Sequence, residues 1–102
     1  MMTVHHGFQA TMTAQPGKAD ELIALLLDAP SLPHDDCLVF LVSRSASDPD
    51  VVHVIEGWTS AEAHSAFFAG EQAQALVAKL QPMLAGDSAY TDAVPVGGKA
   101  TF

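Results

Sequence analysis

The amino-acid sequence predicts an α+β fold with the element order β-α-β-β-α-β, formed by one domain over residues 1–102. Two kinds of pattern predict it: segments with apolar residues at helical spacing, and segments that alternate or run apolar as strands do. Turns rich in Pro, Gly and Asp separate these segments. A chain of 102 residues with 49% hydrophobic residues can bury one core, and it is too short for two domains.

The first two elements are a strand and a helix. Residues 5–14 alternate apolar and polar side chains, which predicts a half-buried strand. The Pro-Gly pair at 16–17 ends this strand. Residues 18–28 then carry apolar side chains at helical spacing, and Pro30 and Pro33 follow. An amphipathic helix that ends before the first of these prolines is therefore expected.

The middle of the chain predicts a β-hairpin. Residues 37–43 form an apolar run rich in β-forming residues, and residues 51–58 form a second one. The turn at 45–50 between them contains an Asp-Pro pair. Neither run alternates, so both faces of these two strands are apolar.

The last third predicts a helical segment and a final strand. Thr59 with Glu62 fits a capping box, with Thr59 as the N-cap. The helical pattern is interrupted at Gly70, resumes over 71–82, and gives way to a strand over 87–96. The resulting order is that of the ferredoxin-like split βαβ fold, a four-stranded antiparallel sheet with helices on one face.

The uncovered face of such a sheet predicts a partner. The strands at 37–43 and 51–58 are apolar on both faces, while helices cover only one. Monomers rarely expose a large apolar patch. A homodimer formed through the sheet faces by two-fold symmetry is therefore expected.

Charge and targeting patterns exclude several classes of partner. The chain has 4 Lys and Arg against 12 Asp and Glu, a net charge of −8, and its cations are scattered as Lys18, Arg44, Lys79 and Lys99. No basic patch is available for nucleic acid or an anionic membrane surface. No apolar run reaches the ~18 residues of a membrane span, and no basic leader precedes the first strand. A cytoplasmic protein is expected, with Cys37 as a buried apolar side chain.

A family resemblance rests on motifs spread from about residue 5 to residue 94. They are the run Pro16-Gly17-Lys18-Ala19-Asp20-Glu21-Leu22, the pair Cys37-Leu38, Arg44, the pair Asp48-Pro49, and the run Glu56-Gly57-Trp58-Thr59-Ser60-Ala61-Glu62-Ala63. In this combination the chain resembles the antibiotic biosynthesis monooxygenase family, whose quinol monooxygenase-like members have a dimeric α+β barrel fold. The resemblance implies a homodimer with a ligand cavity between sheet and helices in each subunit.

The resemblance also implies a chemistry. Better-studied members oxidise phenolic or quinol-type aromatics with molecular oxygen and use no metal, flavin or other cofactor. Trp58 matches the tryptophan of the family's Glu-x-Trp motif, which lines the cavity in polyketide-oxidising members. A small aromatic or apolar ligand and molecular oxygen are therefore the expected partners.

At several positions this chain has other residues than those that line the pocket in members of the family. Polyketide-oxidising members carry an asparagine and an aromatic hydroxyl where this chain has Val54 and His64. Quinol-type relatives often have a histidine at the position of Phe67. Haem-degrading relatives use an asparagine and a histidine at the positions of Ala10 and Val77, so haem binding through that histidine is not expected.

His64 is the predicted catalytic residue. Direct reaction of a substrate anion with oxygen requires a dry cavity and a base or hydrogen bond that holds the phenolate, and histidine titrates near neutral pH. A solvated His64 on the helix surface is equally compatible with the pattern. The residues expected to bind substrate are Trp58, Phe67, Phe68, Phe40 and Ala10.

Other chemistries find little support in the sequence. His5 and His6 are adjacent on a strand and face opposite ways, and a possible approach of His53 does not complete a zinc or iron motif. No metal is expected. Glu56 shares a strand face with Trp58, where a structural hydrogen bond is a simpler role than acid catalysis. The alternative to the enzyme is a non-catalytic dimeric module that binds an apolar small molecule.

Overall fold

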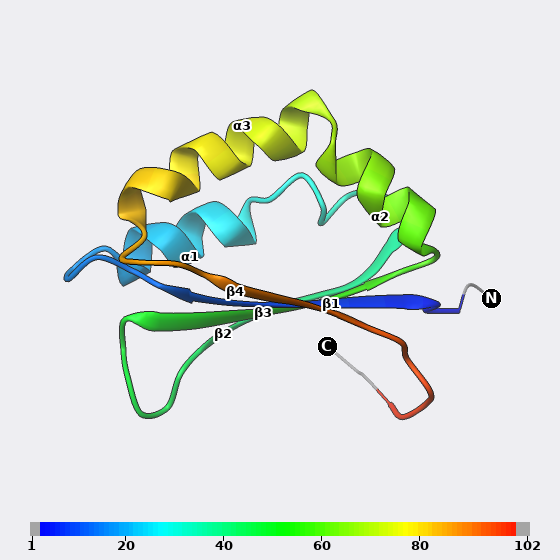
Figure 1. Ribbon diagram of the computed structural model, residues 1–102, viewed down its shortest axis with the longest axis horizontal. Helices are drawn as coiled ribbons and strands as arrows, with labels where there is room; N and C mark the ends of the chain where they lie inside the picture. The colour runs from blue at the N-terminus through cyan, green and yellow to red at the C-terminus, as the bar shows by residue number, and fades with distance from the viewer. Residues whose placement is uncertain (1–2, 100–102) are drawn as a thin grey trace.

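A computed structural model describes residues 3–99, which form one four-stranded antiparallel sheet and three α-helices (Figure 1). The sheet order is β2-β3-β1-β4, so the predicted ferredoxin-like α+β fold is confirmed. The elements are β1 (His6–Thr13), α1 (Ala19–Leu27), β2 (Cys37–Arg44), β3 (Val51–Trp58), α2 (Ala61–Phe68), α3 (Glu71–Leu80), the 3-10 helix η1 (Gln81–Met83) and β4 (Ala89–Ala93).

All three α-helices lie on one face of the sheet, and α2 and α3 form an arch above it (Figure 1). The core lies between sheet and helices because alternate residues of the central strands point there. Val52 of β3 and Leu22 of α1 are fully buried in it, and Met12 of β1 is 4% exposed.

The opposite face of the sheet has no helix among residues 3–99. Ile55 of β3 remains 43% exposed there, and Val39 and Leu41 of β2 are half-buried. Within the same residues, no helix is long and apolar enough to cross a lipid bilayer.

The start of α2 differs from the predicted capping box by one residue. Ser60, not Thr59, is the N-cap, and its hydroxyl accepts a 3.0 Å hydrogen bond from the amide of Ala63. Thr59 is still part of the chain leaving β3: its amide donates to the Asp36 carbonyl and its hydroxyl donates to the Asp36 carboxylate, both at 2.9 Å. The predicted cap at Thr59 is wrong because these bonds hold that residue to the loop before β2.

Two strand predictions also change. The last strand was expected over 87–96, but β4 covers only Ala89–Ala93, the part that pairs with β1, and Pro95 beyond it has no amide hydrogen to donate. In β2 the register shifts at its start, so that Cys37 lies opposite Trp58 and Val39 opposite Gly57. Cys37 therefore faces the helices, because the bulge between Cys37 and Val39 breaks the alternation that would otherwise give them the same face.

Candidate active site

A cavity of about 470 Å³ lies between the sheet and the helices. Its walls are mainly apolar and include five aromatic side chains, Phe8, Phe40, Phe67, Phe68 and Tyr90. Every strand contributes at least one residue to it, and α2 and α3 close the other side. The arrangement suits a flat, apolar, small molecule.

Glu56 of β3 places a carboxylate in this apolar wall. Its side chain is 13% exposed, and the Trp58 indole donates a 2.9 Å hydrogen bond from Nε1 to Oε1. Residues two apart on a strand share a face, which is why Trp58 reaches it. Burial raises the pKa of Glu56 above its ordinary value, and the Trp58 hydrogen bond and the nearby His6 oppose that rise.

His64 of α2 lies against Glu56 and lines the same cavity. Its Nε2 is 3.8 Å from Glu56 Oε1, its ring centroid is 4.9 Å from that of Phe8, and only 12% of the side chain is exposed. The alternative of a solvated His64 is therefore wrong. Burial lowers the pKa of His64, the neighbouring His6 lowers it further, and Asp92 raises it.

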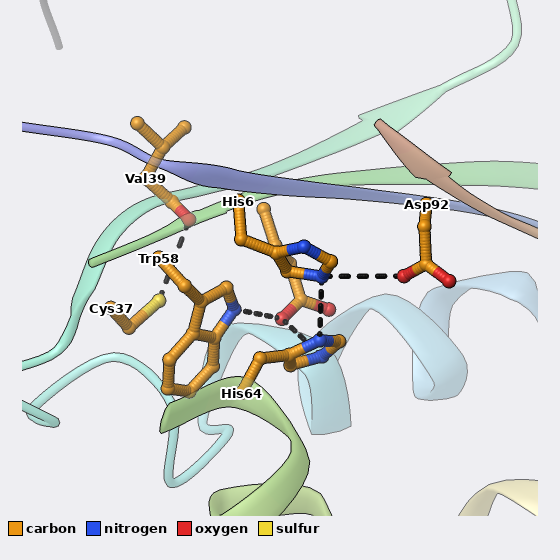
Figure 2. A network of polar contacts seen from close by, with 7 residues as sticks. His6, Cys37, Val39, Trp58, His64 and Asp92 are labelled. Carbon is orange, nitrogen blue, oxygen red and sulfur yellow. Dashed lines mark hydrogen bonds and ion pairs between the residues drawn. The ribbon is translucent and has the colours of Figure 1, made fainter. Parts of the chain in front are cut away.

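Two further polar residues extend this pair toward the edge of the sheet (Figure 2). His6 at the start of β1 has its Nε2 3.2 Å from Nδ1 of His64. The same His6 nitrogen is 3.3 Å from a carboxylate oxygen of Asp92 on β4. Glu56, His64, His6 and Asp92 thus form one continuous row of titratable side chains.

Trp58 lies behind the cavity wall and does not line it. The indole is fully buried, with its ring centroid 5.1 Å from those of Phe67 and His64 and 5.4 Å from that of His34. The family motif predicts that Trp58 binds substrate. In the structure its contact with the cavity is indirect, through the hydrogen bond that holds Glu56.

The other predicted site residues meet around the cavity. His64, Phe67, Phe68, Phe40 and Ala10 all contribute to its lining, and their contact with substrate stays a prediction. Both adjacent phenylalanines lie in the last turn of α2 and line the cavity, and Phe68 remains 50% exposed.

Sequence reasoning missed Glu56 as a cavity residue and missed His6 and Asp92 as neighbours of His64. The structural hydrogen bond expected for Glu56 comes from the Trp58 indole. The cationic Arg44 is not its partner, because it pairs with Asp20 of α1. Glu56 lies four residues after the buried Val52 and two after the buried Val54, so strand alternation puts it on the same covered face. This spacing could have indicated that Glu56 faces the helices. For His6 and Asp92 the pairing of β1 with β4 was needed as well.

Comparisons with known proteins agree with this architecture. The chain is similar to the solved structure of a candidate antibiotic biosynthesis monooxygenase from Chloroflexus aurantiacus, with 33% identity, coverage of 93% of this chain and 96% of the other, and a TM-score of 0.82. A second such structure, from Caulobacter crescentus, has 26% identity, coverage of 94% and 93%, and a TM-score of 0.83.

A third structure with this description, from Deinococcus radiodurans, has 22% identity, coverage of 95% and 98%, and a TM-score of 0.81, and shows the shared fold. No curated protein matches the chain. The family model described as antibiotic biosynthesis monooxygenase matches residues 6–79. The chain therefore belongs to the antibiotic biosynthesis monooxygenase family.

Proposed function

We propose that this protein is a monooxygenase that oxidises a small aromatic phenol or quinol with molecular oxygen, without flavin or nicotinamide. The observation that carries the proposal is the aromatic-walled cavity with Glu56 and His64 side by side in its lining. Family membership supports a monooxygenase activity of the same kind. A filled core at this place would have favoured the non-catalytic binding module instead.

The proposed reaction needs no external reductant. A quinol that becomes a hydroxyquinone loses two hydrogen atoms and gains one oxygen atom, which releases four electrons in all. Molecular oxygen accepts these four electrons: one of its atoms enters the product and the other leaves as water with the two hydrogen atoms. The protein has to exclude bulk water and help the substrate hydroxyl lose its proton.

The Glu56–His64 pair is the proposed proton acceptor. A carboxylate and an imidazole in contact can hold one proton between them, and both side chains are nearly buried within the cavity wall. Phe8, packed on the His64 ring, and Trp58, hydrogen-bonded to Glu56, keep the pair in place. Since the chain carries a net charge of −8, a neutral or weakly acidic aromatic suits it better than an anion.

We also propose that the active form is a homodimer joined through the open sheet face. That face exposes Ile55 and leaves Val39 and Leu41 half-buried, which supports contact with a second apolar surface. The same face of a second copy is such a surface, and two-fold symmetry brings the two together.

Oxygen uptake with a panel of simple quinols, under aerobic and anaerobic conditions, tests the activity. We expect an oxygen-dependent product and a loss of at least about 100-fold in kcat for Glu56→Gln, because general-base contributions are of that order. Glu62→Gln on the exposed surface of α2 is the matched control and should keep full activity. Ligand binding without oxygen uptake would instead identify a binding module, and full activity in both Glu56→Gln and His64→Asn would remove the proposed base.

A further inference from the structure

The outer part of the row of titratable residues is a group of three metal-ligating side chains. His6 comes from β1, His64 from α2 and Asp92 from β4, and Figure 2 shows them pointing toward one another. One ligand atom from each lies within 4.8 Å of the other two. Two of the three side chains are nearly buried, at 14% and 12% exposure, and Asp92 is 74% exposed at the solvent side.

Two of the three distances between the ligand atoms suit one metal ion, and the third, between His64 and Asp92, is within 4.8 Å. Ligands at the usual bond length of ~2.1 Å are separated by roughly 3.0 Å in octahedral and 3.4 Å in tetrahedral geometry. His6 Nε2 lies 3.2 Å from His64 Nδ1 and 3.3 Å from Asp92 Oδ1. Both values fall between the two geometries.

The His64 ring is also oriented as a ligand would be. Its Nδ1 faces His6 Nε2 at 3.2 Å, while its Nε2 faces the Glu56 carboxylate at 3.8 Å. Metal-binding histidines commonly direct their second nitrogen to a carboxylate, which fixes the ring and the tautomer. Trp58 in turn holds the Glu56 carboxylate by a hydrogen bond.

We propose that His6, His64 and Asp92 form a binding site for one first-row divalent transition-metal ion. Two imidazoles and one carboxylate suit Zn²⁺ or Fe²⁺, whereas Mg²⁺ and Ca²⁺ prefer oxygen ligands. Three protein ligands leave at least one coordination position for water or another small molecule. The exposed Asp92 gives the ion a path from solvent, and His64 connects the site to the cavity wall. This inference goes beyond the proposed oxidation, whose electron balance does not require an ion.

Calorimetric titration of the full chain with Zn²⁺ tests the site, with Mg²⁺ as the metal that should not bind. We expect one Zn²⁺ per chain, and at least tenfold weaker binding in both Asp92→Asn and His6→Gln. Asp92 is mostly exposed, so the first of these variants tests the site with little effect on folding. Co²⁺ should give the visible absorption bands of a nitrogen-ligated ion in the wild type.

His53→Gln is the matched control. His53 also lies on a central strand, but it hydrogen-bonds to Thr11 on the open face, so its loss should leave Zn²⁺ affinity unchanged. Absence of stoichiometric Zn²⁺ binding would overturn the proposal. Binding that is weakened in only one of the two ligand variants, or in neither, would also overturn it, because the site requires all three ligands. None of these readouts depends on oxygen uptake, so the site and the proposed reaction can fail separately.

Discussion

The two faces of the sheet come from the same four strands but have different surroundings. On the helix-covered face, Val52 and Val54 of β3 are at most 2% exposed, and Val54 lines the cavity. Figure 1 shows α2 and α3 arching over this face. On the open face, Ile55, the residue after Val54 in the same strand, is 43% exposed. Because alternate residues of one strand point to opposite faces, one face contains the core and the candidate active site. The other face is exposed and can contact a partner.

The difference in burial between the two faces predicts different effects of substitutions on each face. The covered face is stabilised by burial within one chain, so its substitutions should lower the free energy of unfolding. The exposed apolar side chains of the open face should respond mainly through association, because they have no helix to contact within residues 3–99. Each of the following variants tests this contrast.

The largest expected effect is that of Trp58→Ala on the covered face. The indole is fully buried against His64 and Phe67 and holds Glu56, so its loss leaves a cavity and an unsatisfied carboxylate. We expect the free energy of unfolding to fall by about 3–5 kcal/mol. Urea denaturation measures it. A loss below about 1 kcal/mol would mean that the covered face is not the stabilising one.

Ile55→Asp should act on association instead. A carboxylate at the centre of the open face would be desolvated in a sheet-to-sheet dimer, so we expect the dissociation constant to rise by about 100-fold or more. Light scattering across a dilution series would show a dimer in the wild type and a monomer in the variant. Leu27→Asp on the exposed side of α1 is the control and should stay dimeric. A wild-type protein that is monomeric at micromolar concentration would contradict the assignment of the open face.

Gly57→Ala should have a smaller effect, through crowding on the open face. A Cβ at Gly57 would lie 2.9 Å from a methyl of Val4 and 3.1 Å from the side chain of Val39. We expect a loss of about 1–3 kcal/mol in thermal or urea unfolding. Its cross-strand partner Gly7 is the matched control, since a Cβ there would meet Ala93 at 3.3 Å, and Gly7→Ala should cost less. Equal losses in the two variants would show that crowding at β2 is not the cause.

The smallest expected effect concerns Cys37 and leaves the fold unchanged at neutral pH. Burial raises the pKa of this thiol from 9.0 to about 11, with Glu56 adding to the rise and a hydrogen bond to Val39 opposing it. At pH 8 we expect alkylation by iodoacetamide to be roughly a hundredfold slower than in the urea-unfolded chain, because so little thiolate is present.

The sign of the pH effect on stability follows from the same shift. The folded chain holds the Cys37 proton more tightly than the unfolded chain, so this contribution to stability is present below pH 9.0 and is lost as the pH rises toward about 11. The labelling rate of the folded protein should climb about tenfold per pH unit over the same range. A rate that is already at its plateau at pH 9 would show that Cys37 is not held on the covered face.

The sequence predicts the elements well because their signals are local. Alternation and helical spacing place β1, α1 and β3 within a residue or two of their observed bounds. The cap at Ser60 was missed by one residue because Thr59 has a competing partner, Asp36, in a distant loop. The spacing of residues around Thr59 cannot reveal a hydrogen-bond partner that lies in a distant loop.

The candidate site was harder to predict because it depends on pairing between strands. His64, Phe40 and Phe67 could be expected from a family resemblance and from periodicity. The approach of His6 to Asp92 depends on the register of β1 with β4, and their approach to His64 depends on how α2 crosses the sheet. Neither is encoded in the spacing of residues along one element.

Gly70 lies between α2 and α3, where its close contact with the end of α2 affects the dimensions of the cavity. A Cβ at this position would lie 3.2 Å from the carbonyl oxygen of Phe67, so a larger residue would require that carbonyl to shift by a few tenths of an ångström. The last turn of α2 carries both Phe67 and Phe68, which line the cavity, while Gly70 itself does not. The dimensions of the cavity should therefore respond to a substitution at a residue outside its lining, without altering any side chain of the pocket.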